Sequence, residues 1–338
     1  MKLTMRLGAR SYDIIIKAGG LARVGQLISL DRKVLVVSDE GVPPQYAEAV
    51  LAQCREGYAA VVPQGEGSKS LAVYGHLLEE MLKHGFGRSD AVVAVGGGVV
   101  GDLAGFVAAS YMRGITFINC PTTTLAQVDS SIGGKVAVNL AGTKNVVGAF
   151  YQPSLVVADT AALDTLSPRH WAEGLAEAVK AGLIADETLF ELFETADAHA
   201  CIDEIITRSL VVKKNIVEKD ERETGVRAAL NFGHTIGHAI ESAEHLGGLY
   251  HGECVGLGML PMLETEPLRR RLRAVLTKLG LPARIEYDGD EIMGYLAHDK
   301  KVAADGQITV VTVPAAGQFA LQKMPLEKLR ALVGEGIG

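Results

Sequence analysis

The sequence has few cysteines, no long apolar run and no basic tract, and each of these absences excludes a class of protein. Its four cysteines, Cys54, Cys120, Cys201 and Cys254, are widely spaced along 338 residues and form no paired-cysteine metal motif. They are too few for a disulfide scaffold at this length, so a reducing cytoplasm is the expected location. No apolar stretch approaches the ~20 residues of a membrane-spanning helix, and charges interrupt the first residues where a targeting segment would be apolar. We therefore expect no membrane partner.

The charge balance also limits the partners. The chain carries 33 basic and 40 acidic residues, a formal net charge of -7, and these charges form no basic cluster. Nucleic acid is therefore not expected as the main partner. No internal repeat or low-complexity tract is present. With 338 residues, 48% of them hydrophobic, the chain exceeds the usual domain size and is expected to form two domains.

The first half of the sequence alternates short β-branched segments with helical ones. One helix is expected over residues 70–83, where apolar residues share a face and Gly85 supplies a stop. This alternation predicts a parallel sheet whose ligand crevice lies at the carboxyl ends of its strands. The glycine-rich, polar segment 128–151 is interpreted as ordered loops over a site or as a linker. Strands are expected at residues 12–17, 34–37, 59–62, 90–95, 115–119 and 155–158.

The second half is predominantly helical. Ser167 and Pro168 combine a helix cap with a proline at the first helical position. The boundary is expected near residues 159–167. It separates a Rossmann-like α/β nucleotide-binding domain at residues 1–160 from a mainly helical domain at 161–338. Helices are expected at about 168–184, 202–218, 234–243, 252–263, 268–279 and 290–298, followed by a hairpin of strands 307–313 and 318–321.

A glycine cluster follows the strand expected at residues 90–95. Gly96, Gly98 and Gly101 satisfy the G-x-G-x-x-G pattern between a strand and a helix, where backbone amides approach a pyrophosphate. The alternative is a tight strand-to-helix turn with no ligand, because no acidic residue stands ~20 positions further on as a ribose partner. Asp39, at the end of an earlier strand, is a candidate for that role.

A histidine cluster lies in the helical half. His234 and His238 are four residues apart and therefore share one helix face, Asn231 stands one turn before them, and His251 follows after a short link. Such a set is able to hold a divalent metal, although a histidine pair of this spacing is at least as often a packed pair in a core. With Glu177 as a third ligand, His234 and His251 would leave one zinc position open for substrate.

Other charged residues have no local signature. Glu177 and Lys180 share a helix face, and a surface ion pair is the ordinary interpretation of that spacing. Scattered cations could form an anion pocket together with Asn145 and Asn231. The residues alone do not select among these cations, which are Lys135, Lys213, Arg227 and Lys300.

Together these motifs resemble the 3-dehydroquinate synthase family. The resemblance runs through nearly the whole chain in order, and its most specific segments are residues 129–135 (DSSIGGK) and 231–238 (NFGHTIGH). The other matching segments are residues 96–115, 121–139, 144–153, 174–180, 220–241, 251–253 and 299–301. The resemblance implies an α/β nucleotide-binding lobe, a helical lobe, tightly held NAD, a divalent metal (zinc, with cobalt as a second candidate) and a homodimer.

The resemblance also implies a role for each site residue. The implied metal ligands are Glu177, His234 and His251. Its NAD contacts are Asp39, Glu66, Lys69, Gly97, Gly98, Asp102, Thr122, Thr123, Lys144 and Thr165. Its substrate contacts are Asp129, Lys135, Asn145, Lys213, Arg227, Asn231 and Lys300, with Lys301 left open as an alternative to Lys300 and with Arg113 reaching a neighbouring subunit. Its proton-transfer groups are His238 and Glu223, and Lys135, Asn145, Arg227 and Asn231 complete the catalytic set.

The family's reaction closes a sugar phosphate, 3-deoxy-D-arabino-heptulosonate 7-phosphate, to 3-dehydroquinate in the shikimate pathway. The implied steps are oxidation by NAD, phosphate elimination, reduction, ring opening and an intramolecular aldol closure. Three alternatives stay open: a related sugar phosphate cyclase, an NAD-dependent polyol dehydrogenase of the glycerol dehydrogenase type, and a non-catalytic NAD-binding module. The presence of both Asn231 and His238 favours dehydroquinate synthase among the cyclases.

Overall fold

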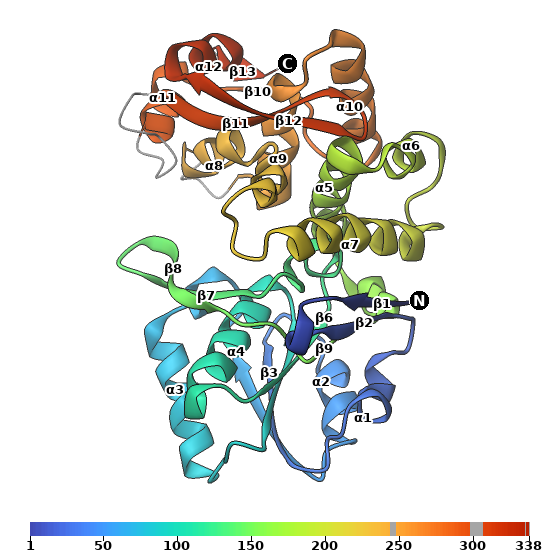
Figure 1. Cartoon of the computed structure of the whole chain (residues 1–338), viewed down its shortest axis with the longest axis vertical. Helices are drawn as coiled ribbons and strands as arrows, with labels where there is room; N and C mark the ends of the chain where they lie inside the picture. Colours follow the sequence, from blue (N-terminus) through green and yellow to red (C-terminus); the bar gives the residue numbers. More distant parts are fainter. Residues whose placement is uncertain (244–247, 298–306, 335, 338) are drawn as a thin grey trace. The chain divides into compact units, whose positions relative to one another are not determined.

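The computed structural model describes residues 1–243, 248–297, 307–334 and 336–337, and the chain divides into two compact units (Figure 1). The first unit spans Met1–Ser167 and the second spans Pro168–Gly338. The first unit thus extends past residue 160 and includes the 3₁₀ helix Thr160–Thr165. This helix stays there because the Asp159 carboxylate accepts hydrogen bonds from Ala161 N at 3.1 Å and from Gly19 N at 2.8 Å.

The first unit is built on a seven-stranded sheet in the order β1-β2-β9-β6-β5-β3-β4. Strands β1 and β2 are antiparallel, and from β2 to β4 all neighbours are parallel. This confirms the predicted α/β class with a parallel sheet. The strands are β1 (Lys2–Met5), β2 (Tyr12–Ile16), β3 (Lys33–Asp39), β4 (Glu56–Val62), β5 (Ala91–Gly96), β6 (Thr116–Pro121) and β9 (Leu155–Ala158).

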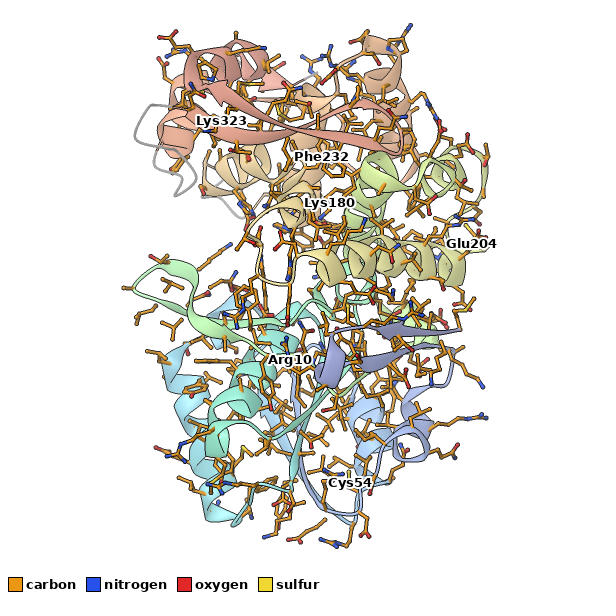
Figure 2. The ribbon with its side chains drawn as sticks, viewed as in Figure 1. Arg10, Cys54, Lys180, Glu204, Phe232 and Lys323 are labelled. Atoms are coloured by element: carbon orange, nitrogen blue, oxygen red, sulfur yellow. The ribbon has the colours of Figure 1, made fainter. Side chains whose placement is uncertain are left out.

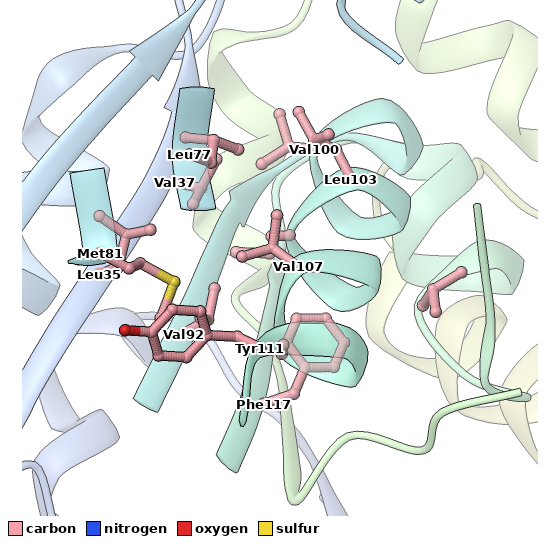
Figure 3. Packing of buried hydrophobic residues seen from close by; sticks show 14 of the residues in the cluster. Leu35, Val37, Leu77, Met81, Val92, Val100, Leu103, Val107, Tyr111 and Phe117 are labelled. Atoms are coloured by element: carbon pink, nitrogen blue, oxygen red, sulfur yellow. The ribbon is translucent and has the colours of Figure 1, made fainter. Parts of the chain in front are cut away.

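Side chains that alternate along the central strands form a core on each face of this sheet. On β3, Leu35 and Val37 pack into one cluster with Phe117 and Met81, as Figure 3 shows. Val34 and Val36 belong to the cluster on the opposite face. Because both faces are covered, the strands are continuous apolar runs, as expected of a parallel sheet. The helices of this unit are α1 (Val24–Leu27), α2 (Pro44–Leu51), α3 (Leu71–Lys83) and α4 (Gly98–Ser110).

The interpretation of residues 128–151 as loops or linker was wrong for most of that segment. Strands β7 (Lys135–Leu140) and β8 (Thr143–Phe150) form an antiparallel hairpin there. Val136 and Val138 alternate into the core of the unit, and this burial fixes the register. The pattern is short and lies among glycines and polar residues, so its period of two is weak in the sequence.

The second unit is mainly helical, as predicted, with small two-stranded sheets. It contains two helices that the sequence analysis missed, α6 and α12, and its β11–β12 hairpin confirms the predicted pairing. No helix in the described part of the chain is both long and apolar enough to cross a membrane. The helices are α5 (Pro168–Ala185), α6 (Glu187–Thr195), α7 (Ile202–Lys219), α8 (His234–Ala243), α9 (His251–Met259), α10 (Glu266–Lys278), α11 (Gly289–Ala297) and α12 (Leu326–Val333). The strands are β10 (Ile285–Glu286), β11 (Gln307–Ala315), β12 (Gln318–Pro325) and β13 (Gly336–Ile337).

Candidate metal centre and nucleotide site

Helices α5, α8 and α9 bring the three predicted metal ligands together. Glu177 Oε1 lies 3.2 Å from His234 Nε2 and 3.7 Å from His251 Nε2. The Glu177 side chain is only 1% exposed, and within the described residues neither of its oxygens accepts a hydrogen bond of good geometry. A buried carboxylate needs compensating positive charge; Lys180 Nζ supplies it beside Oε2, and a metal between Oε1 and the two imidazoles would add to it. The donor set of one carboxylate and two imidazoles fits a divalent metal such as zinc.

Hydrogen bonds to the far side of each ring fix which nitrogen faces Glu177. His234 Nδ1 lies 3.1 Å from the carbonyl oxygen of Phe232, which only accepts hydrogen bonds. His251 Nδ1 lies 3.1 Å from Glu241 Oε2. As metal ligands both imidazoles would be neutral, so Nδ1 would carry the proton and Nε2 would offer its lone pair on the side of Glu177. Such backing by a carbonyl or carboxylate is typical of histidines that bind metals.

Lys180 places a positive charge beside this cluster. Its Nζ pairs with Glu177 Oε2, and its side chain, labelled by residue in Figure 2, is 3% exposed. Burial opposes ionisation of Glu177, but the charges of Lys180 and His234 outweigh it and hold its pKa well below the ordinary value. For His251, burial also opposes the charged form and so lowers the pKa. The Glu177 and Glu241 carboxylates outweigh this effect and raise the pKa to about 10. The surface ion pair considered for Glu177 and Lys180 is thus a buried one.

His238 belongs to the same cluster. Ligand atoms of His234, His238 and His251 all lie within 4.8 Å of one another, and the His238 side chain is exposed. The ring centroids of His238 and His251 are 5.8 Å apart. The geometry thus allows His238 either to bind the same ion or to transfer protons next to it.

The segment between α7 and α8 carries the remaining predicted residues of this unit. Asn231 Nδ2 donates to Glu223 Oε1 at 2.8 Å, so these two predicted residues are in contact. Arg227 is 2% exposed, and its guanidinium donates to the carbonyl of Glu221. Lys213, on α7, is also buried, at 8% exposure. Lys300 and Lys301 lie outside the described residues.

In the first unit, Lys69 is the centre of a polar cluster. Its Nζ lies 2.8 Å from Asp102 Oδ2 and 3.7 Å from Glu66 Oε1, and it also donates to Asn145 Oδ1. Asn139, which the sequence analysis did not single out, links the cluster by donating to Glu66 Oε1 at 2.8 Å and accepting from Asn145 N at 2.8 Å. The structure therefore brings four of the predicted residues together.

The glycine cluster forms the turn from β5 into α4, and the helix begins at Gly98 rather than after the cluster. A Cβ atom at Gly97 would lie 3.1 Å from Thr123 Cγ2, and one at Gly98 would lie 3.1 Å from Ser130 Oγ. Thr122 N donates to the carbonyl of Gly96 at 2.9 Å, which holds the ends of β5 and β6 together. This is the strand-to-helix geometry in which a helix N-terminus approaches a phosphate.

Other predicted residues of this unit surround the same edge of the sheet or lie on its loops. Asp39 ends β3, accepts a hydrogen bond from Gly41 N at 2.8 Å, and has a pKa raised by burial. Thr165 Oγ1 lies 3.2 Å from the hydroxyl of Tyr46. Asp129 lies in a π-helical turn, Lys135 begins β7, Lys144 lies on β8, and Arg113 is exposed beside Met112.

Several residues around the candidate metal centre were missed by sequence reasoning. Glu241 backs His251, and Glu173 Oε2 accepts a hydrogen bond from Gly252 N at 3.1 Å. Burial raises the pKa of Glu173 to about 7. A regular spacing along α5, at residues 169, 173 and 177, is the one signal that could have indicated a shared face.

The fold and this cluster first define a class of protein. The structure superimposes on a 2-deoxy-scyllo-inosose synthase described in complex with carbaglucose-6-phosphate, NAD⁺ and Co²⁺, with a TM-score of 0.87, 28% identity and full coverage of both chains. It also superimposes on the 2-epi-5-epi-valiolone synthase ValA from Streptomyces hygroscopicus, described with NAD⁺ and Zn²⁺ bound. That match has a TM-score of 0.84 and 27% identity, and it covers 95% of each chain. Both relatives are sugar phosphate cyclases.

Sequence comparison then identifies the family. Residues 59–173 match the model of the 3-dehydroquinate synthase N-terminal domain, and residues 174–302 match that of the C-terminal domain. A 3-dehydroquinate synthase from Streptococcus thermophilus is 43% identical over 351 aligned positions, covering 98% of this chain and 99% of the relative. The chain belongs to the 3-dehydroquinate synthase family.

Proposed function

We propose that this chain converts 3-deoxy-D-arabino-heptulosonate 7-phosphate to 3-dehydroquinate and phosphate as an NAD- and metal-dependent lyase. The observation that carries the chemistry is the buried Glu177 carboxylate facing the Nε2 atoms of His234 and His251 at 3.2 and 3.7 Å. When bound, NAD would supply reversible hydride transfer, and the metal would polarise the oxygen on the carbon that is oxidised. Glu177, His234 and His251 would hold the metal, which is zinc or cobalt.

The chain's own residues bind the substrate and move its protons. The cations Lys213 and Arg227, both buried, suit the carboxylate and phosphate of a sugar phosphate. Asn231 is held by Glu223 and presents an amide for hydroxyl groups. His238 is exposed within the histidine cluster and is positioned to transfer protons near neutral pH. The ring closure is intramolecular, so much of its acceleration comes from holding the two ends of one molecule together.

NAD is assigned to the first unit. Gly97 and Gly98 at the start of α4, Asp39 at the end of β3 and the cluster around Lys69 supply backbone amides, a carboxylate and a cation for a dinucleotide. Glu66, Asp102, Thr122, Thr123, Lys144 and Thr165 complete the proposed set. Asp129, Lys135 and Asn145 are proposed as substrate contacts from this unit.

A homodimer is part of the proposal. Arg113 is exposed, and its backbone has φ +68° beside Met112 at φ +50°, a strained conformation of the kind that clusters at functional sites. We propose that it reaches the site of a second subunit. Sedimentation velocity measures the mass of the particle, and a monomer at catalytic concentrations would refute this part.

Turnover separates the proposed reaction from its alternatives. Purified protein is incubated with the heptulosonate phosphate, a catalytic amount of NAD and zinc, and phosphate, NADH and the carbocyclic product are measured. We expect one phosphate per 3-dehydroquinate and no net NADH. Stoichiometric NADH would instead indicate a polyol dehydrogenase, and a different ring product would indicate another cyclase.

The metal is tested with the same assay. Chelation or His234→Ala should abolish turnover, because both remove the ion, and elemental analysis should show less than one metal per chain. His238→Asn should retain the metal while turnover falls by roughly 10²–10⁴-fold, the usual effect of losing a proton-transfer group. Loss of the metal in His238→Asn would assign His238 to the ion instead. Undiminished turnover after complete metal removal would contradict metal dependence.

A further inference from the structure

Three successive turns of α5 face the first turn of α9. Arg169, Glu173 and Glu177 are spaced four residues apart and therefore lie on one side of α5. Each contacts a different residue at the start of α9. Glu177 faces His251 Nε2 at 3.7 Å, and Glu173 accepts a hydrogen bond from Gly252 N at 3.1 Å. Arg169 pairs with Glu253.

The two helices approach closely enough to require glycine. A Cβ atom at Gly252 would lie 1.9 Å from the carbonyl oxygen of Glu173, a backbone atom that cannot move out of the way by itself. Any shift of α9 along α5 would therefore change the position of His251, the residue before Gly252. The separation of Glu177 from His251 depends on how this helix pair is held.

The Arg169–Glu253 pair holds the first turn of α9 on the side of the helix that faces solvent. Arg169 Nε and Nη2 donate to the two oxygens of Glu253, each at 2.7 Å. Glu253 Oε2 also accepts from Tyr250 N at 2.7 Å, which caps the helix, and the Arg169 guanidinium lies 4.0 Å from the centre of the Tyr250 ring. Arg169 further donates to the carbonyl of Gly248. These contacts fix the chain on both sides of His251.

Bidentate geometry makes this pair a rigid link. A planar guanidinium with two parallel hydrogen bonds to a carboxylate fixes direction as well as distance, and Glu253 is buried at 5% exposure. The ring of Tyr250 restricts the guanidinium further. Because a metal tolerates only small changes in ligand distance, a link that sets the position of His251 relative to Glu177 controls the metal affinity.

We propose that Arg169 and Glu253 are positioning residues for the metal centre, setting the distance between its ligands on α5 and α9. The inference rests on the proposed metal site and adds two residues that do not themselves bind the ion. It assigns them to metal affinity and coordination geometry, beyond any stability that the ion pair itself provides.

Arg271 provides a matched control in the same unit. Its Nε and Nη2 donate to the two oxygens of Glu194 at 2.7 and 2.8 Å, and its guanidinium lies 5.1 Å from the centre of the Phe190 ring. This second bidentate pair links α10 to α6, which carry none of the proposed metal ligands. Arg271→Ala therefore removes the same kinds of contact without touching the helices that hold the metal.

The test measures Co²⁺ binding by full-length native protein and by the variants Arg169→Ala, Glu253→Gln and Arg271→Ala. Affinity is obtained by competition with a chromophoric chelator, geometry from the visible d–d bands of Co²⁺, and stability from thermal unfolding of the metal-free proteins. We expect Arg169→Ala and Glu253→Gln to bind Co²⁺ roughly 10–100-fold more weakly, with altered d–d bands, as other losses of outer-shell support do. Arg271→Ala should lower the melting temperature while Co²⁺ affinity stays within about twofold.

Two results would overturn the proposal. One is Co²⁺ affinity in both Arg169→Ala and Glu253→Gln within about twofold of native, and the other is an equal loss of affinity in Arg271→Ala. If Arg169→Ala does not fold, as judged by circular dichroism, the isosteric Glu253→Gln decides. Failure of the native protein to bind Co²⁺ would refute the metal centre itself. This outcome differs from failure of the positioning proposal, in which the native protein binds Co²⁺ and the variants bind it equally well.

Discussion

At the scale of single residues, three of the proposed site residues share a costly backbone conformation. Arg113, Asn145 and Glu223 have φ values of +68°, +55° and +60°. Residues other than glycine rarely adopt this left-handed backbone conformation. Such a conformation persists only where its surroundings determine it, and it clusters at functional sites. For Glu223 the surroundings are known, because the Asp220 carboxylate accepts hydrogen bonds from the next residues, Thr224 N at 2.9 Å and Gly225 N at 2.7 Å.

Asp220 should therefore make stability depend on pH in the acid range. The backbone N–H groups of Thr224 and Arg227 lower the pKa of its carboxyl to about 2. A lowered pKa in the folded state contributes stability above the unfolded-state value of ~3.9, and this contribution disappears as the pH falls toward 2. The melting temperature of Asp220→Asn should thus lie below that of the native protein at neutral pH. Thermal unfolding from pH 7 to pH 2 should show the two values converging, and a gap that stays constant or widens in acid would contradict the assignment.

At the scale of elements, helix α3 shows how local rules act at a helix end and on its exposed side. Ser70 caps the helix by accepting from Val73 N at 3.3 Å, and Gly85, with φ +62°, follows its end. Gly75 lies within the helix, and a Cβ atom added there meets nothing within 4 Å. The two glycines therefore differ in what they contribute, since only Gly85 occupies a conformation that glycine favours.

Replacing these glycines should change stability in opposite directions. Gly75→Ala should raise the free energy of unfolding by roughly 0.5–1 kcal/mol, because alanine restricts the unfolded chain and fits the helix. Gly85→Ala should lower it by roughly 1–2 kcal/mol, because a side chain is strained in the left-handed region. Urea unfolding of both variants measures the two values. A loss of stability in Gly75→Ala would show that the helix surface is more tightly packed than the structure indicates.

At the scale of the whole molecule, the proposed ligands divide between the two units. All the proposed NAD contacts lie in Met1–Ser167, whereas Glu177, His234 and His251 lie in Pro168–Gly338. A ligand that binds the folded state stabilises what it contacts, by about 2.7 kcal/mol at a hundred times its dissociation constant. Each ligand should therefore protect a different set of backbone amides.

Hydrogen exchange followed by mass spectrometry tests this division. Zinc alone should slow exchange most in α5, α8 and α9, and NAD alone should slow it most at the β5–α4 turn and the residues around Lys69. Metal-free, NAD-free protein is the reference. Protection by zinc that is largest in the sheet of the first unit would contradict the assignment of the metal ligands.

The sequence by itself determined most of the elements and the kinds of chemistry. The apolar runs of β3 and β5 and the glycines after β5 are local signals, and His234 and His238 share a face through the period of one helix. Motif resemblance then supplied the proposed roles of residues that no local pattern distinguishes, such as Lys213 and Arg227.

Only the tertiary structure decided which of these groups meet. It placed the Glu177 carboxylate of α5 against two imidazoles, and it joined Arg169 to Glu253 across 84 positions of the chain. It also formed the β7–β8 hairpin from a segment whose glycines conceal its alternation. Contacts between distant segments leave no period in the sequence, because they depend on how whole helices pack. The distances that make a metal centre are therefore a property of the fold.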